Sequence, residues 1–266
     1  MISLKLISDG ALWAVACRAH ETLRVDRVLD DPFASHLATD RGEELFVAAG
    51  SVASFALTVG AATIDDVLRR SVGDHHIHTV TALGAGLDTR PYRLELPSDL
   101  RWIEADLEPV LGYKVLRLAH AVPHCQVRRI NVDLSDAGER NGVLLEIARD
   151  VTRGLVLTEG LVVLGREAID DLIEQMPPMF KYWIANTILP PFNVWSIGGE
   201  RENYRAEPAV APNDILDAFE RRRWRPAEFR PLKEQARRLG ETRWTGHAAA
   251  HSPGEREGIW LFQRPV

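Results

Sequence analysis

Apolar positions follow a helical spacing in the first 70 residues and form strand-like runs after residue 77. Residues 11–23 and 42–70 are predicted helices, and the second is expected to break near Gly50 or Gly60, since glycine disfavours helix interiors. Strands are predicted at 77–86, 101–106, 125–133, 154–164 and 181–189, with helices between them at 108–120, 137–150 and 166–176. Strands that alternate with helices predict a parallel sheet with right-handed crossovers.

The last third of the chain has weaker periodicity. Residues 190–212 contain several prolines and are predicted to form a loop or lid. A helix is expected at 214–224, a short strand or turn at 228–232 and a final strand at 258–264. The predicted fold class is therefore a doubly wound, mostly parallel α/β domain, preceded by a helical extension.

Composition narrows the class of protein. The 266 residues are 45% hydrophobic and 26% charged, which is typical of a globular chain, and the formal net charge of −6 predicts no general attraction to nucleic acid or to an anionic membrane. Cys17 and Cys125 have no spacing that predicts a disulfide framework or a zinc site. The apolar N-terminal stretch is too short for a membrane span and lacks the layout of a signal peptide, so we predict a cytoplasmic protein.

A glycine-rich loop follows the first predicted strand. Gly84 and Gly86 allow a tight turn and a close backbone approach to a ligand at the carboxyl edge of the sheet. Glu104 and Asp106 end the next strand, where an acidic side chain can accept the hydroxyl groups of an adenosine ribose or simply cap the following turn. Asp88 and Thr89 stand where a dinucleotide-binding loop would have its third glycine, which favours adenosylmethionine over NAD.

Acidic residues also follow the third and fourth predicted strands. Asp133, with Leu134, ends the third strand, and Glu159 lies at the apparent turn of the fourth. Each could be a helix cap, but together they would line one edge of the sheet, where open α/β sheets bind ligands. A carboxylate there can hold an adenine amino group or the ammonium group of a methionine moiety.

The string Leu83 to Leu94 (LGAGLDTRPYRL), followed by IEADLEPVLGYK, NVDLSD and TEGLVVL, resembles the leucine carboxyl methyltransferase family. The segments ACRAHE and DDPFASHLA resemble the N-terminal helices of its bacterial, natural-product branch, and the resemblance covers about residues 10–165. It implies a class I methyltransferase (Rossmann-like) fold and transfer of a methyl group from S-adenosyl-L-methionine to an oxygen. The expected parts are a helical cap (1–72), a cofactor-binding core (73–189), a lid or substrate insertion (190–257) and a final strand (258–266).

The resemblance also implies the residues that contact the cofactor. They are expected to be Arg18, Gly84, Ala85, Gly86, Asp88, Glu104, Asp106, Asp133, Leu134 and Glu159. The family commonly has an arginine ahead of the IDD segment that grips the cofactor carboxylate, whereas this chain has TVGAATIDDVL, with Gly60 in that place. Either Arg18 or Arg90 compensates, or affinity for the cofactor is reduced, or the protein has moved away from methyl transfer.

Two other groups of residues are given structural interpretations, and a third keeps a catalytic alternative. The histidines near Asp74 are assigned to a solvated loop rather than to a metal site, and Arg221, Arg222 and Arg223 to a charged helix end rather than to contacts with an acidic substrate. His247 or His251 could act as a general base for a hydroxyl substrate, although no residue stands out as catalytic.

Three functions therefore stay open. We expect an O-methyltransferase in secondary metabolism that acts on a carboxylate or hydroxyl of a small molecule or peptide. The alternatives are a cofactor-binding fold without methyl transfer, as a scaffold or a pericyclase-like catalyst, and a nicotinamide oxidoreductase, which the absent third glycine disfavours. The sequence predicts neither the oligomeric state nor the acceptor.

Overall fold

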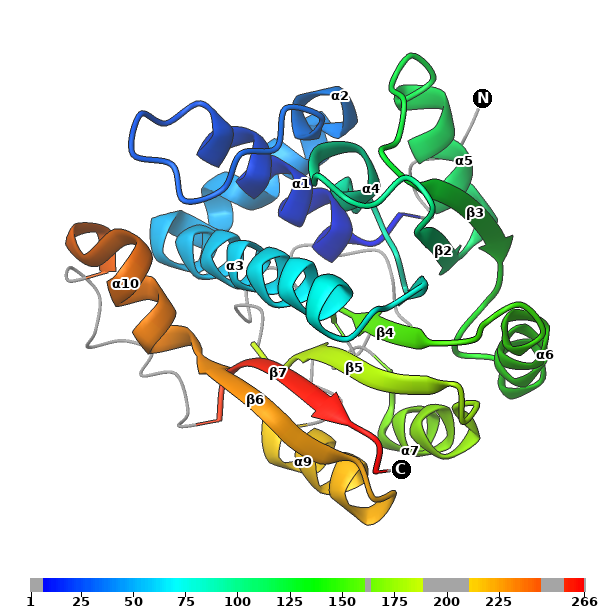
Figure 1. The fold of residues 1–266 in the computed structure, drawn as a ribbon. Coiled ribbons are helices and arrows are strands. Elements are labelled where there is room, and N and C mark those ends of the chain that lie inside the picture. Colours follow the sequence, from blue (N-terminus) through cyan, green and yellow to red (C-terminus); the bar gives the residue numbers. More distant parts are fainter. Residues whose placement is uncertain (1–6, 161–163, 189–210, 245–255, 266) are drawn as a thin grey trace.

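The computed structural model describes residues 7–160, 164–188, 211–244 and 256–265, which form one sheet with helices on both of its faces (Figure 1). The helices are α1 (Asp9–Thr22), α2 (Ala34–Leu37), α3 (Asp40–Asp74), α4 (Arg90–Arg93), α5 (Glu108–Arg117), α6 (Ala137–Ala148), α7 (Arg166–Gln175), α9 (Pro212–Arg221) and α10 (Leu232–Trp244). The strands are β1 (Thr79–Leu83), β2 (Arg101–Asp106), β3 (Gln126–Asn131), β4 (Gly154–Thr158), β5 (Phe180–Asn186), β6 (Arg225–Pro231) and β7 (Gly258–Gln263).

The sheet has the strand order β3-β2-β1-β4-β5-β7-β6. The first five strands in this order are parallel, and β7 runs antiparallel to both β5 and β6. The predicted doubly wound, mostly parallel fold is confirmed. The order reverses between β1 and β4, and the crevice at such a reversal is where open α/β sheets bind their ligands.

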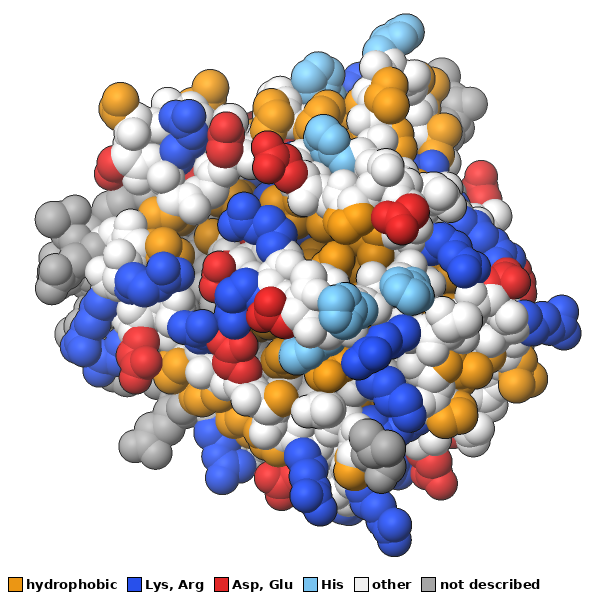
Figure 2. Space-filling model, in the orientation of Figure 1, with side chains coloured by type: hydrophobic (Ala, Val, Ile, Leu, Met, Phe, Trp, Pro, Cys, Tyr) orange, Lys and Arg blue, Asp and Glu red, His pale blue; other side chains and the backbone are white. Residues whose placement is uncertain are grey.

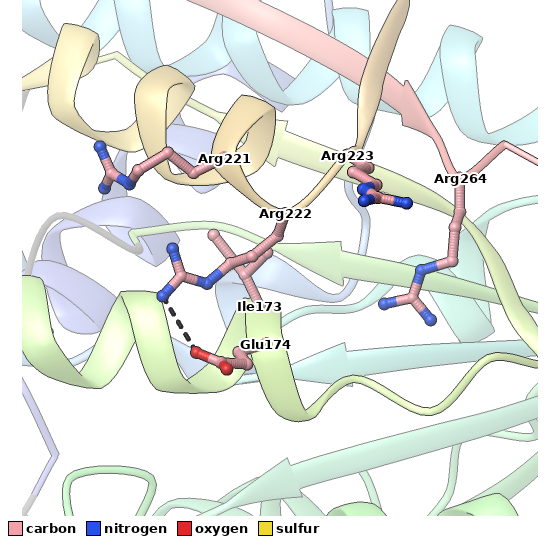
Figure 3. A pocket seen from close by; sticks show the side chains of 6 residues that line it. All are labelled: Ile173, Glu174, Arg221, Arg222, Arg223 and Arg264. Carbon is pink, nitrogen blue, oxygen red and sulfur yellow. Dashed lines mark hydrogen bonds and ion pairs between the residues drawn. The ribbon is translucent and has the colours of Figure 1, made fainter.

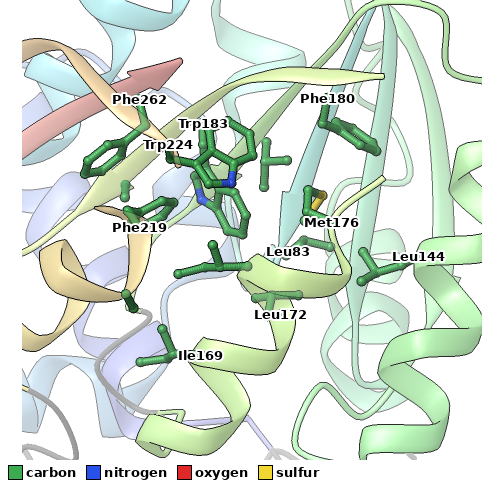
Figure 4. Packing of buried hydrophobic residues seen from close by; sticks show 14 of the residues in the cluster. Leu83, Leu144, Ile169, Leu172, Met176, Phe180, Trp183, Phe219, Trp224 and Phe262 are labelled. Atoms are coloured by element: carbon green, nitrogen blue, oxygen red, sulfur yellow. The ribbon is translucent and has the colours of Figure 1, made fainter. Parts of the chain in front are cut away.

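Two apolar layers enclose the sheet. On one face α6, α7 and α9 cover one apolar cluster. Within it Trp183 lies edge-on to Phe219 and Trp224, and Phe262 stacks on Phe219 (Figure 4). On the other face the second half of α3 contributes residues such as Ile64 and Leu68. Strands β1 and β4 are buried along their whole length, as is usual where helices cover both faces.

The N-terminal helices form a cap over one end of the sheet. Helix α1 packs along α3, and the two enclose an apolar cluster with α5. The predicted break in the second helix is confirmed at Gly50, whose φ of 80° and ψ of 169° are not helical. Among the described residues, α3 is the one helix long and apolar enough to cross a membrane by length and composition, but it contacts α1, α10, β5 and β7.

The described part of the predicted lid or substrate insertion (190–257) is regular structure. It forms α9, β6 and α10, and β6 is an edge strand of the main sheet. The sequence does not predict α10, because this segment is highly charged and shows no clear apolar face. Two parts of the predicted lid, 190–210 and 245–255, lie outside the described residues, as do His247 and His251.

The kink at Gly50 generates a stability prediction. This backbone conformation is almost exclusive to glycine, so Gly50→Ala should lower the free energy of unfolding by about 1–3 kcal/mol in urea denaturation. Gly142, inside α6, is the control, because a Cβ added to it would meet nothing within 4 Å. Gly142→Ala should be neutral or stabilising by up to about 1 kcal/mol. Equal effects of the two substitutions would contradict the assignment of the kink.

Candidate functional site

The loop after β1 doubles back on β2. Its turn is closed by the N–H groups of Gly84 and Ala85, which both donate to the carbonyl of Ala105, at 2.9 and 3.3 Å. Gly84 and Gly86 have φ values of 68° and 49°, in the left-handed region that favours glycine. A Cβ on Gly84 would meet nothing within 4 Å, so the loop has open space beside it at the switch point of the sheet.

Asp106 joins the end of β2 to this loop. Its Oδ2 accepts a hydrogen bond from the Gly86 N–H at 2.6 Å, and its Oδ1 accepts one from the Leu107 N–H at 2.7 Å. Burial raises the pKa of Asp106 above its ordinary value despite these bonds. Each oxygen retains a lone pair for a further donor, and the residue is only partly buried.

Glu104, two residues earlier on the same strand, is fully buried. One carboxylate oxygen accepts from Lys114 Nζ at 2.6 Å, and the other from Arg129 Nε at 2.9 Å. The side chains of Glu104 and Lys114 have no solvent exposure at all. Of the two acidic residues that the sequence analysis placed at the end of β2, Glu104 is therefore internal and Asp106 is the accessible one.

Asp133 and Leu134 follow β3, next to the end of β2. Asp133 Oδ1 accepts from the backbone N–H and the hydroxyl of Ser135, at 2.9 and 2.6 Å, and the Ser135 hydroxyl bond is the main cause of its lowered pKa. The carbonyl of Leu134 accepts from Arg140 at 2.8 Å. Asp133 is therefore ionised at the same edge of the sheet as Asp106.

Glu159 directly follows β4, on the other side of the switch point. Its exposed side chain forms an ion pair with Arg90. The next residue, Gly160, has a φ of 78°, and a Cβ there would meet nothing within 4 Å. The glycines after β1 and β4 thus both border open space, and the acidic residues predicted at three strand ends lie at one edge.

The side chain of Arg18 is bound to the glycine loop and to the cap, rather than left unpaired beside the loop. Its Nε forms an ion pair with Asp31 at 2.8 Å, and its Nη2 donates to the carbonyl of Leu87 at 2.8 Å. Asp31 also accepts from the hydroxyl of Thr89 at 2.6 Å. Arg18 therefore holds α1 to the loop that contains the expected cofactor contacts.

A second buried group of charges ties α3 to α4. Asp65 accepts from Arg90 Nε at 2.7 Å and from Arg93 Nη1 at 2.5 Å, and all three side chains are nearly inaccessible. Burial alone would raise the pKa of Asp65, but Arg93 and Arg90 outweigh it and lower the value. Arg90 also pairs with Asp88 at 2.9 Å, and this charge lowers the Asp88 pKa against the effect of burial.

The place of the expected arginine in α3 is closely packed. A Cβ on Gly60 would lie 2.8 Å from Cδ1 of Ile188, so a larger side chain would require that side chain to move. Arg90 and Arg18 are the two candidates to replace this arginine. Arg90 forms an ion pair with Glu159 at the edge of the site, whereas Arg18 is bound to Asp31 and to the carbonyl of Leu87.

The histidines near Asp74 have structural contacts. His75 stacks on Tyr182 with ring centroids 4.1 Å apart, and His78 lies 3.4 Å from the hydroxyl of Thr152. In the described ranges no three His, Cys, Asp or Glu side chains come together as a metal site would require.

Four residues of this site were missed by the sequence reasoning: Asp31, Asp65, Arg93 and Lys114. Asp31, Arg93 and Lys114 lie within strings that carry the family resemblance, and Asp65 lies in the IDD segment, where the chain departs from the family pattern. The sequence does not show the pairing of these residues, because Asp65 meets Arg90 and Arg93 only after the helical cap docks on the sheet, and Asp31 meets Arg18 only after the loop that follows α1 folds back on this helix.

Comparison with known proteins places the chain among methyltransferases. The sequence model of the leucine carboxyl methyltransferase family matches residues 11–177. A relative from Frankia alni, whose name assigns it to the S-adenosyl-L-methionine-dependent methyltransferases, is 29% identical over 64% of this chain, and the match spans 65% of that relative's length. A similarly named protein of Streptomyces coelicolor is 30% identical over 91% of this chain and 82% of its own.

Solved structures show the same fold. A crystal structure from Thermobifida fusca, also named for a methyltransferase, has a TM-score of 0.58 at 18% identity and covers 91% of this chain and 95% of its own. A DUF574-family protein from Streptomyces avermitilis has a TM-score of 0.59 at 13% identity and covers 95% and 97%. At these identities the likeness shows the architecture, which is that of class I methyltransferases.

The charges around Asp65 generate a pH-dependent prediction. Asp65→Asn should cost about 3–5 kcal/mol of unfolding free energy at pH 7, because it leaves two buried guanidinium groups without their carboxylate. The folded pKa of Asp65 is lowered, so its stabilisation is present above the unfolded pKa, about 4, and is lost as the pH falls through the folded value.

Urea denaturation at pH 7 and at pH 3 measures the cost of Asp65→Asn in unfolding free energy and its dependence on pH. The gap between wild type and Asp65→Asn should narrow at the lower pH. Asp66→Asn is the control, since Asp66 pairs with the half-exposed Arg70 and should cost at most about 1 kcal/mol. A gap that stays constant with pH would contradict the ionised state of Asp65.

Proposed function

The chain belongs to the leucine carboxyl methyltransferase family, and we propose that it binds S-adenosylmethionine and transfers the methyl group of this cofactor to an oxygen of its acceptor. The observation that carries the proposal is the switch point. There Gly84 borders open space, and the carboxylate of Asp106 is bound to the glycine loop at Gly86. A ligand with a ribose but no diphosphate fits a loop with two glycines and an acidic partner.

The residues present suit the parts of this cofactor. Asp106 would accept from the two ribose hydroxyls, because each of its oxygens retains a lone pair, and Asp133 has an ionised carboxylate that would accept from the adenine amino group. Gly84, Ala85 and Gly86 would allow close approach of the backbone, with Leu134 beside the base. The open positions at Gly84 and Gly160 support a ligand lying across both strand ends.

The charges of Arg90 and Glu159 match the remaining amino-acid group. Glu159 would accept from its ammonium, and Arg90 would face its carboxylate, in place of the arginine that is absent at Gly60. Arg90 and Glu159 form an ion pair with each other in the structure. On binding, this pair would open, and each side chain would pair with the opposite charge of the ligand instead. Asp65 and Asp88 hold Arg90 in position for that exchange.

The cofactor supplies the reactive methyl carbon, and the protein would align the acceptor oxygen with it and exclude water. A carboxylate acceptor is ionised at pH 7 and needs no general base, whereas a phenol or alcohol does. We therefore favour a carboxylate of a small molecule or peptide over a hydroxyl. A role in secondary metabolism and a cytoplasmic location are part of the same proposal.

A binding test addresses the cofactor. In calorimetric titration the wild type should bind S-adenosylmethionine and S-adenosylhomocysteine with micromolar dissociation constants, and Asp106→Ala should weaken both at least tenfold because the ribose acceptor is removed. Glu108→Gln, a charge removed from the exposed first turn of α5, should bind like the wild type. Wild-type affinity should also fall at acid pH, as Asp106 protonates at its raised pKa. No binding by the wild type would refute the proposal.

The presence of Gly60 where the family commonly has an arginine favours a second candidate function, a cofactor-binding fold that no longer transfers methyl groups. Ile188 packs against Gly60, so the place where the family has its arginine is filled and holds no basic side chain. Under our proposal Arg90 compensates, so S-adenosylhomocysteine should bind at least tenfold more tightly than methylthioadenosine, which lacks the amino-acid charges. Glu159→Gln should reduce that ratio. Equal affinity for both ligands, without methylation of any carboxylate acceptor tested, would support the second candidate.

A further inference from the structure

A pocket at the opposite end of the sheet is lined by four arginines (Figure 3). Its lining residues are Ile173, Glu174, Arg221, Arg222, Arg223 and Arg264. The backbone N–H of Arg264 donates to the carbonyl of Lys181, at the start of β5. Since β5 spans seven residues, the pocket lies about 20 Å from the carboxyl ends of the parallel strands. It is therefore separate from the proposed cofactor site.

Two of the arginines have carboxylate partners. Arg221 pairs with Asp170 at 3.1 Å, and Arg222 pairs with Asp170 at 3.2 Å and with Glu174 at 3.1 Å. These bridges join the end of α9 to α7 and agree with the charged helix end expected from the sequence. They explain Arg221 and Arg222 but not the other two cations.

Arg264 is a half-buried cation held by neutral groups. Its Nη1 donates to the carbonyls of Met176 and Pro177, at 3.0 and 3.1 Å, and its guanidinium carbon lies 4.6 Å above the Trp224 ring. Burial lowers its pKa, and within the described part of the chain no carboxylate forms an ion pair with it. A guanidinium has five N–H donors, so the edge formed by Nε and Nη2 is left for another acceptor.

Arg223 occupies a backbone conformation that glycine would adopt more easily. Its φ is 63°, and it ends α9 in a Schellman arrangement, in which its N–H donates to Glu220 and that of Trp224 donates to Phe219. Here an arginine takes the position, and its guanidinium lies on the same side of the pocket as that of Arg264 (Figure 3). A strained residue held in place is a reason to look for a ligand.

We propose that this pocket binds a small phosphate-bearing anion between Arg223 and Arg264. The planar guanidinium donors match the oxygens of a phosphate, and two forks can share one phosphate group. The carboxylates of Asp170 and Glu174, paired with Arg221 and Arg222, would repel an anion toward the side of Arg223 and Arg264. The chain as a whole has a net charge of −6 and so provides no general attraction for an anion. On the face drawn in Figure 2, acidic and basic side chains are mixed.

The test uses a variant that should not harm the fold. Arg223→Gly removes the guanidinium but suits the left-handed φ, so its thermal stability should equal or exceed that of the wild type. Arg225→Gln is the matched control, because it removes one positive charge two residues away without lining the pocket. Inorganic phosphate and glycerol 3-phosphate are titrated by calorimetry into all three proteins, at constant ionic strength and without adenosyl ligands.

The wild type should bind at least one of the two anions, Arg223→Gly should lose at least tenfold in affinity, and Arg225→Gln should keep it within twofold. Tighter binding of the ester than of free phosphate would identify an organic ligand, and the reverse would identify inorganic phosphate. The proposal is overturned by a wild type that does not bind at millimolar concentrations, by wild-type affinity in Arg223→Gly, or by an equal loss in Arg225→Gln.

Discussion

Buried carboxylate–guanidinium pairs fix the helical cap on the sheet, and the positions of the candidate ligand groups depend on them. Asp65 in α3 holds Arg90 and Arg93 of α4, and the Arg18–Asp31 pair inside the cap binds the carbonyl of Leu87 and the hydroxyl of Thr89 in the loop after β1. Desolvating such charges costs several kcal/mol each, and their mutual attraction about offsets that cost. Their main consequence is therefore geometric, because any other docking of the cap would leave buried charges without partners.

This constraint explains why the glycine loop is held in place although its backbone is unusual. The carbonyl of Leu87 is bound by Arg18, the carboxylate of Asp88 by Arg90 and the hydroxyl of Thr89 by Asp31. Three successive residues at the end of the loop are thus tied to the cap or to α4. A ligand that meets the loop finds its N–H groups and carboxylates already oriented, which lowers the ordering cost of binding.

The sequence predicted the fold well where a local pattern determines it. Apolar runs located the five parallel strands, and glycine marked the kink of α3 and the turn after β1. The sequence did not predict the role of a residue where that role depends on a partner brought in by the tertiary fold. Strand alternation puts Glu104 and Asp106 on one face, yet only the arrival of Lys114 from α5 decides that Glu104 is internal.

The same limit applies to Arg18 and to α10. A basic residue in the first helix is compatible with a ligand contact or with a buried bridge, and the choice rests on Asp31, which reaches it through a loop of no regular structure. Helix α10 has little apolar periodicity. Its Leu232 and Ala236 pack against Phe55 and Val59 of α3, whereas Lys233, Glu234 and Arg237 are exposed. Both outcomes depend on surfaces that the chain creates only when it is folded.

The two ends of the sheet differ in how their charges are balanced, and this difference separates scaffold from site. At the carboxyl end Arg18, Arg90 and Arg93 each have a carboxylate partner, and the surplus charge is negative, because Asp106 and Asp133 form no ion pair among the described residues. At the amino end the surplus among the described residues is positive, on Arg223 and Arg264. A cation held by carbonyls and an aromatic ring is stabilised less than one held by a carboxylate. An uncompensated charge of either sign is therefore where the folded chain can still gain free energy by binding a ligand.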